Sequence, residues 1–146
     1  MEMLHQDITD KILKAFFTVF KDMGHGFSER VYENSLIIEL TELGLTCEKQ
    51  KPITVYYRNQ IVGEYFADII VNGKVIVELK AGSSIVSEHE AQLLNYLKAS
   101  KLEVGLLLNF GTFGTFKRKI FTNDKKITSS GFIPNEVFNP DDEKKH

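Results

Sequence analysis

The chain has 146 residues, of which 42% are hydrophobic and 26% charged, and its formal net charge is −2. This length suits one domain with a buried core, while the slightly negative charge argues against a broad basic surface that binds nucleic acid by charge alone. The single cysteine, Cys47, excludes an intrachain disulfide framework, and no apolar run approaches the roughly 20 residues that span a bilayer. The N-terminus also lacks the pattern of a signal peptide, so we expect a cytoplasmic protein.

Two helices are predicted before the first strand. Apolar residues recur every three or four positions over residues 4–22, which is the pattern of an amphipathic helix, and a glycine-containing loop at 23–26 ends it. Ser28 is a suitable N-cap for a second helix, which ends near Gly44.

The second helix carries a polar face and an apolar one. Glu29, Tyr32 and Glu33 share a face because they lie three and four residues apart. The side predicted to be buried contains Val31, Ser35, Leu36, Ile38, Leu40 and Leu43.

Three strands are predicted next, over residues 46–57, 61–71 and 74–80, because these segments are rich in β-branched and aromatic residues. Asn72-Gly73 fits a two-residue hairpin turn, in which both positions need a positive φ. Pro52 suggests that the first strand lies at a sheet edge or contains a bulge. Tight turns between successive strands predict an antiparallel meander.

A third helix and two further strands complete the predicted elements. Ser87 and Glu90 form the pattern of a capping box for a helix that runs to about residue 100. The nearly continuous apolar run 103–110 is typical of a strand covered on both faces, and its position after a helix predicts parallel pairing. Residues 115–122 are predicted to add one more strand.

The order of elements predicts an α/β fold with a central mixed sheet, in which helices flank an antiparallel three-strand meander and a parallel crossover strand. We expect one domain over residues 1–122. A polar C-terminal extension follows over 123–146, and its end, 139–146, is expected to fray.

Three ionisable residues interrupt the most apolar part of the chain. Asp68 lies within one predicted strand, and Glu78 and Lys80 lie two residues apart near the end of the next, on one face. Burying such groups is unfavourable unless they are paired or bind a ligand. An aspartate beside a Glu-x-Lys on the neighbouring strand has the arrangement of a divalent-metal site with an adjacent lysine. The alternative is a structural ion pair, which would leave one carboxylate unpaired.

Motifs along most of the chain resemble a known family. Residues 26–32, Gly-Phe-Ser-Glu-Arg-Val-Tyr, match the Gly-x-x-Glu-x-x-Tyr signature of the GxxExxY protein family, and 66–68, 77–80 and 89–96 resemble its later blocks. The similarity extends to about residue 121. That family is grouped with the PD-(D/E)XK nuclease-like superfamily. The resemblance therefore implies a restriction-endonuclease-like fold and cleavage of phosphodiester bonds with Mg²⁺.

The resemblance also implies roles for the residues at the centre of the chain. Asp68 and Glu78 would hold Mg²⁺, or Mn²⁺ as a substitute, with the backbone carbonyl of Leu79 as a further ligand. Lys80 would orient or deprotonate the attacking water and stabilise the developing negative charge.

Helix residues on either side of the sheet would complete this catalytic site. Glu29 corresponds to an acidic residue that many superfamily members supply for metal binding from the helix before the sheet, and Glu33 is the alternative if Glu29 points away. Gln92 and Tyr96 match a Gln-x-x-x-Tyr motif and are predicted to contact substrate or orient the lysine, or else to form a partly buried polar helix face. Tyr32 is a third predicted substrate contact, with core packing as its alternative.

Two groups of basic residues are candidate nucleic-acid contacts. One combines 49–51 with Arg58, and the other combines 117–119 with Lys125 and Lys126. The alternative for both groups is a solvated surface.

Three functions follow from these observations. The first is a Mg²⁺-dependent nuclease, an enzyme that acts on DNA or RNA. The second is a non-catalytic module of the same fold that binds nucleic acid or a protein partner. The third is a homo-oligomeric scaffold, in which the first helix and strand 53–57 form the subunit interface.

Overall fold

The computed structural model describes residues 3–126, so the predicted frayed end at 139–146 lies outside the described residues. The elements are α1 (Gln6–Met23), α2 (Glu29–Glu42), β1 (Cys47–Tyr57), β2 (Gln60–Val71), β3 (Val75–Lys80), α3 (Ser87–Lys98), β4 (Val104–Phe110), β5 (Gly114–Ile120) and the 3₁₀ helix η1 (Asn123–Lys126). None of the helices within this part of the chain is long and apolar enough to cross a membrane.

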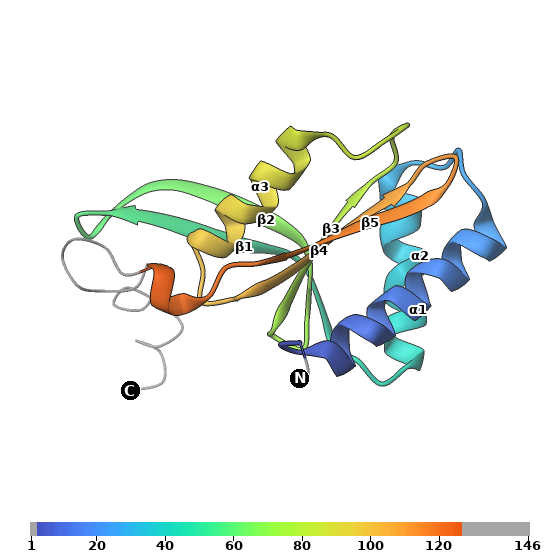
Figure 1. The fold of residues 1–146 in the computed structure, drawn as a ribbon, viewed down its shortest axis with the longest axis horizontal. Coiled ribbons are helices and arrows are strands. Elements are labelled where there is room, and N and C mark those ends of the chain that lie inside the picture. The colour runs from blue at the N-terminus through green and yellow to red at the C-terminus, as the bar shows by residue number, and fades with distance from the viewer. Residues whose placement is uncertain (1–2, 127–146) are drawn as a thin grey trace.

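The strands form one five-stranded sheet in the order β1-β2-β3-β4-β5. The pairs β1–β2, β2–β3 and β4–β5 are antiparallel, whereas β3 and β4 are parallel because the chain crosses over through α3. Figure 1 shows α1 and α2 together on one side of the sheet, α3 on the other, and the β1–β2 hairpin extending away from the rest as an arm. The predicted mixed sheet with flanking helices is confirmed, and Pro52 lies in an edge strand, as expected.

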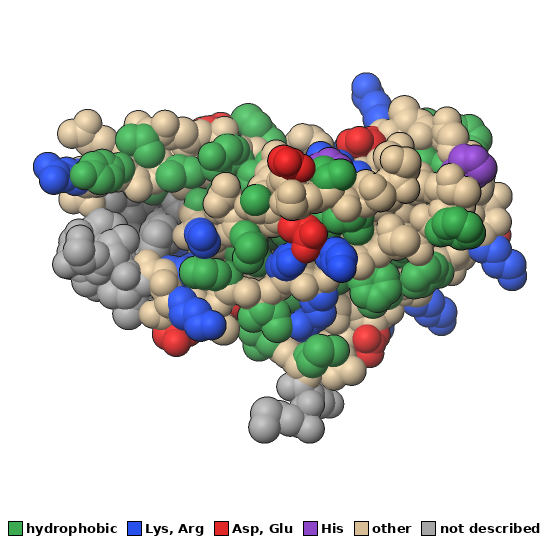
Figure 2. All heavy atoms as spheres, turned by 45° about the horizontal axis from the view of Figure 1, so that its top comes forward, with side chains coloured by type: hydrophobic (Ala, Val, Ile, Leu, Met, Phe, Trp, Pro, Cys, Tyr) green, Lys and Arg blue, Asp and Glu red, His purple; other side chains and the backbone are tan. Residues whose placement is uncertain are grey.

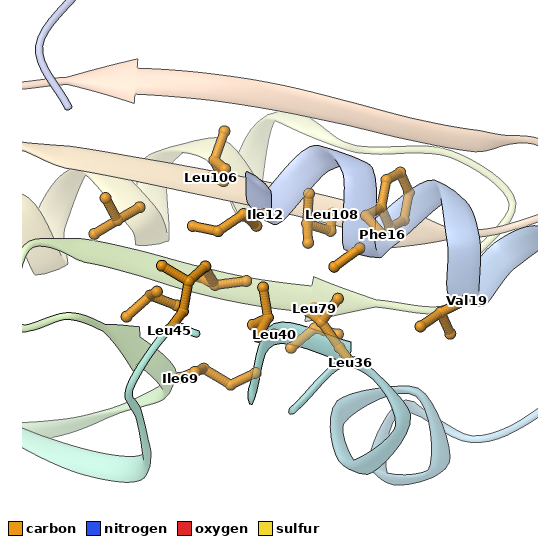
Figure 3. Packing of buried hydrophobic residues seen from close by; sticks show 14 of the residues in the cluster. Ile12, Phe16, Val19, Leu36, Leu40, Leu45, Ile69, Leu79, Leu106 and Leu108 are labelled. Atoms are coloured by element: carbon orange, nitrogen blue, oxygen red, sulfur yellow. The ribbon is translucent and has the colours of Figure 1, made fainter. Parts of the chain in front are cut away.

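Both faces of the sheet are buried by helices. On one face, α1 and α2 pack against β2, β3 and β4, and Figure 3 shows Phe16 and Leu36 from the helices meeting Leu79 and Leu108 from the strands. On the other face, Leu93 and other apolar residues of α3 pack against the opposite sides of the same strands. This double coverage explains why β3 and β4 are almost entirely apolar.

The ends of the helices confirm one predicted cap and correct another. Ser28 caps α2, since its side chain accepts a hydrogen bond from the backbone N–H of Val31. The capping box predicted for α3 is wrong because Ser87 is already helical and Val86 precedes it. Instead, the ring nitrogen Nδ1 of His89 accepts a hydrogen bond from the Val86 N–H at 3.4 Å.

The buried side of α2 is narrower than predicted. Tyr32, Glu33, Leu36 and Leu40 are buried, whereas Ile38 is 61% exposed, so the prediction that Ile38 lies in the core is wrong. One stripe of α2 suffices to pack against α1 and the sheet.

The chain remains packed beyond residue 122. Lys126 is 5% exposed, and its ammonium donates hydrogen bonds to the carbonyls of Ser100 at 2.9 Å and Leu102 at 2.6 Å. Burial lowers the pKa of Lys126 to about 8. The backbone N–H of Asn123 donates to a carboxylate oxygen of Glu103. The compact part of the structure therefore continues at least to Lys126.

Gly105 allows α3 to lie close to β4. A Cβ at this position would be 2.6 Å from Cδ1 and 3.1 Å from Cγ of Leu93, a side chain with no exposed surface. Because Leu93 has little room to move, we expect Gly105→Ala to lower the free energy of unfolding by about 1–3 kcal/mol. Urea unfolding measures this change.

Gly63→Ala is the matched control for Gly105→Ala, because Gly63 also lies in a strand but has no atom within 4 Å of its added Cβ. We expect this variant to be close to wild type in stability. If both substitutions changed the free energy of unfolding equally, the contact with Leu93 would not be the cause of the change.

Candidate active site

The candidate site lies at the point where β2 and β3 separate, which we call the fork. The two strands pair over three residues each, and the ladder ends at Ile69 opposite Val77. Beyond it, the side chains of Asp68 and Glu78 take over the hydrogen bonds of the ladder. The N–H of Leu79 donates to Oδ2 of Asp68 at 2.9 Å, and the N–H of Asp68 donates to Oε2 of Glu78 at 3.3 Å. The fork thus holds two carboxyl groups from adjacent strands against each other.

Burial of Glu78 beside Asp68 makes ionisation of Glu78 unfavourable. Glu78 is 5% exposed, and its pKa is raised to about 10, first by burial and then by the hydrogen bond and negative charge of Asp68. The positive charge of Lys80 lowers this pKa but has a smaller effect. Two carboxyl groups in contact behave in this way when they share one proton. A cation would remove the conflict by neutralising both charges.

Glu33 brings a third carboxylate to this pair from α2. The Nε2 atom of Gln50 in β1 lies 3.3 Å from Oε1 of Glu33 and 3.4 Å from Oδ1 of Asp68, donating to both. Burial raises the pKa of Glu33, the hydrogen bond from Gln50 lowers it, and the charge of Asp68 raises it. No sequence pattern pointed to Gln50, whose only local signal is a neutral amide between two lysines of an edge strand.

Glu29 does not reach the pair. It is the first residue of α2, its side chain is exposed, and none of the hydrogen bonds or ion pairs within residues 3–126 joins it to Asp68 or Glu78. The physical reason is its position, because α2 is buried only from Tyr32 onward. Of the two predicted helix carboxylates, the structure therefore brings Glu33 and not Glu29 near Asp68, and a metal-binding role for either stays a prediction.

The carboxylate oxygens of this site are the ligands that a hard divalent cation prefers, although the side chains do not surround a metal position as they stand. Among residues 3–126, no three His, Cys, Asp or Glu side chains are grouped closely enough to hold a metal ion as they stand. However, Oε1 of Glu78 is buried and has no hydrogen-bond partner within these residues. Mg²⁺ needs only two or three carboxylates because it keeps several waters. Asp68 and Glu78 supply two carboxylates. Glu33 is linked to Asp68 through the side-chain amide of Gln50, which donates to both.

Lys80 follows the carboxylate pair at the end of β3. It is half-buried and lies opposite Asn109 of the parallel strand β4. Asn109 also holds the loop after Lys80, since its side chain donates to the carbonyl of Gly82 and accepts from the N–H of Gly82, both at 3.0 Å. The backbone at and after Lys80 is thus held by β4, on the side away from β2. Participation of the Leu79 carbonyl stays a prediction.

Tyr96 approaches the pair from α3, whereas Gln92 lies at the surface. Tyr96 is 5% exposed, and its pKa is raised to about 12 by burial and then by the negative charges of Glu78 and Asp68. Its ring centroid lies 5.1 Å from that of Tyr65, which belongs to β2 in the β1–β2 hairpin. Gln92, one turn earlier, is exposed. Of the predicted Gln-x-x-x-Tyr motif, only the tyrosine adjoins the carboxylates.

Tyr32 is a core residue. Its side chain has no exposed surface and stacks on Phe110 with ring centroids 4.1 Å apart. Its hydroxyl donates to the carbonyl of Gly24 at 2.6 Å and accepts from the N–H of Phe27 at 3.2 Å. Because both the ring and the hydroxyl are occupied, this placement favours the alternative of core packing, and a substrate contact by Tyr32 stays a prediction.

Some of the basic residues singled out in the sequence are ion-paired or buried. Lys51 pairs with Glu48 and Lys119 with Glu90, each at 2.6 Å, and Lys126 is buried. Figure 2 shows basic side chains near the middle of the face that carries α3, with acidic ones among them. Acidic side chains thus interrupt the basic ones on this face, and a nucleic-acid contact by either basic group stays a prediction.

Comparison with known proteins identifies one family. The sequence model of the PD-(D/E)XK nuclease superfamily matches residues 6–121. A solved structure titled "Crystal structure of SSO0001" is similar, with 16% sequence identity, a TM-score of 0.46, and coverage of 85% of this chain and 72% of that one. No curated protein matches the sequence.

Proposed function

Because the chain belongs to the PD-(D/E)XK nuclease superfamily, we propose that it is a divalent-metal-dependent nuclease that hydrolyses phosphodiester bonds in DNA or RNA. The observation that carries this proposal is the hydrogen-bonded pair of Asp68 and the buried Glu78 at the fork of β2 and β3, followed by Lys80 on the same strand as Glu78. Mg²⁺ is the proposed ion and Mn²⁺ its substitute, since both ions prefer oxygen ligands.

Each side chain has a distinct part in the proposed reaction. Asp68, Glu78 and Glu33 would hold the cation, which supplies charge neutralisation at the phosphate and a more acidic bound water. Lys80 would orient that water and donate to the oxygens that gain charge in the transition state. Tyr96 would keep the inner wall of the site closed to solvent and offer its hydroxyl to a phosphate oxygen.

A non-catalytic module of the same fold is the second candidate. It is favoured by the observation that no three metal-ligating side chains are already grouped within residues 3–126. The homo-oligomeric scaffold built on α1 and strand 53–57 stays a prediction, which a mass measurement in solution tests.

Metal-dependent cleavage is the direct test of the proposed function. Purified protein is incubated with single- and double-stranded DNA and RNA in Mg²⁺, in Mn²⁺ and in EDTA, beside the Asp68→Ala variant. We expect cleavage that needs the cation and is lost in Asp68→Ala. If Asp68→Ala binds nucleic acid like wild type and neither protein cleaves any substrate, the non-catalytic module is the correct function.

Glu33 and Glu29 form a matched pair for testing the helix carboxylate, because they lie one turn apart on α2. We expect Glu33→Gln to weaken Mn²⁺ binding by roughly 10-fold or more, since the loss of one charged ligand costs about 1.4 kcal/mol or more. Glu29→Gln should bind like wild type because its side chain is exposed. Isothermal titration calorimetry measures both, and the reverse order would restore Glu29 as the ligand.

A further inference from the structure

The β1–β2 hairpin changes its orientation at Gln50 and Asp68. Ile69 packs with α1 and α2, whereas Ala67, two residues earlier on the same strand, packs with α3. In a regular strand these two residues would face the same side. The pairing runs from Lys49 opposite Ile69 to Lys51 opposite Ala67, so the change falls on the residues between them.

Gln50 carries the backbone distortion at this point. Its φ is +49°, in the left-handed region, although it lies within β1 and has a Cβ. Such a conformation costs a residue other than glycine about 1–2 kcal/mol. Glycine would avoid this cost, so the presence of a glutamine here points to a use for its side chain.

The side chain of Gln50 connects two carboxylates from different elements. Its Nε2 atom carries two hydrogens, and its two acceptors are Oε1 of Glu33 in α2 and Oδ1 of Asp68 in β2. These two oxygens can therefore be no farther apart than the sum of the two hydrogen-bond lengths. A donor that binds both acids also opposes their mutual repulsion.

We infer that Gln50 is a positioning residue that holds Glu33 and Asp68 at the spacing needed for a shared divalent cation. It would act through the carboxylates, by donating to one oxygen of each. The other oxygen of Asp68 accepts from the N–H of Leu79 and keeps a second lone pair for the ion. Partners of this kind typically change metal affinity by 10–100-fold. The inference rests on the proposed function because it assumes that Asp68 is a metal ligand.

The test separates the backbone role of Gln50 from its amide. Gln50→Gly removes the amide but accepts a positive φ without strain, and Gln50→Glu keeps the length but replaces the donor by a charged acceptor. Gln60→Ala is the control, because Gln60 is an exposed glutamine at the far end of the same hairpin. Mn²⁺ affinity of the full chain is measured by calorimetry, and stability in EDTA by urea unfolding.

We expect the Kd for Mn²⁺ to rise 10–100-fold in Gln50→Gly and at least as much in Gln50→Glu, and to stay unchanged in Gln60→Ala. Gln50→Gly should unfold at no lower urea concentration than wild type, which excludes misfolding as the cause. Cleavage by Gln50→Gly should recover at saturating Mn²⁺, as it would not if Gln50 took part in the chemical step.

Two results would overturn the inference, and they differ in what they say of the proposed function. If wild type binds Mn²⁺ and Gln50→Gly binds it equally tightly, Gln50 does not position the ligands, while the metal site stands. If wild type binds no Mn²⁺ at millimolar concentration, the metal site and the role of Gln50 fail together.

Discussion

Replacing Lys80 by methionine is expected to lower the rate of phosphodiester cleavage by roughly 10²–10⁴-fold, the usual contribution of a side chain that moves a proton or stabilises charge in the transition state. Methionine keeps the unbranched shape and apolar stem of lysine but removes its charge. The rate is measured under single-turnover conditions at saturating Mn²⁺, so that weaker metal binding does not contribute.

Lys74→Met is the matched control for Lys80→Met, because Lys74 lies in the turn just before the other end of β3 and is exposed. It should cleave like wild type. The affinity of Lys80→Met for Mn²⁺ should be equal to or greater than that of wild type, since Lys80 is not a ligand and its charge repels the ion. Unchanged cleavage by Lys80→Met would remove lysine from the proposed mechanism.

Glu78→Gln is expected to stabilise the metal-free protein while it abolishes metal binding. The folded protein raises the pKa of Glu78 from 4.5 to about 10. Below about pH 4.5 the carboxyl group is protonated in both the folded and the unfolded state, so its burial does not lower the free energy of unfolding through ionisation. As the pH rises toward about 10, the unfolded chain releases this proton while the folded chain holds it, so stability falls. Glutamine is neutral at every pH and removes this loss.

Glutamine also suits the local hydrogen bonds. Its carbonyl oxygen can accept from the N–H of Asp68, as Oε2 of Glu78 does, and its amide can donate to the Asp68 carboxylate. In EDTA at pH 8 we expect the melting temperature of Glu78→Gln to exceed that of wild type by at least about 4 °C, equivalent to roughly 1 kcal/mol. The difference should shrink at pH 5.

Addition of Mg²⁺ should reverse this order. A ligand that binds only the folded state raises its stability, so wild type should gain stability with Mg²⁺ concentration and Glu78→Gln should not. Glu64→Gln, an exposed position on β2, is the control for the loss of one negative charge. A variant less stable than wild type in EDTA at pH 8 would show that Glu78 is ionised and satisfied without a cation.

Patterns between residues close in the sequence were sufficient for most of the fold. The Asn72-Gly73 turn predicted the β2–β3 hairpin, and both residues have the expected positive φ, 53° and 63°. That hairpin, together with strand periodicity, predicted that Asp68, Glu78 and Lys80 would meet. The local error at the start of α3 has an equally local cause, because Ser87 fits a cap by residue type but lies one residue inside the helix.

By itself, the sequence determined the order of elements, the mixed sheet and the strand residues of the candidate site, because hydrophobic periodicity and turn chemistry act over a few residues. Only the tertiary structure decided which residues join them from elsewhere. Glu29 and Glu33 occupy the same face of α2. Because this helix packs against the rest of the protein only from Tyr32 onward, Glu33 and not Glu29 lies near Asp68. The role of Gln50 depends on a backbone conformation and on two partners 17 and 18 residues away, which no local pattern encodes.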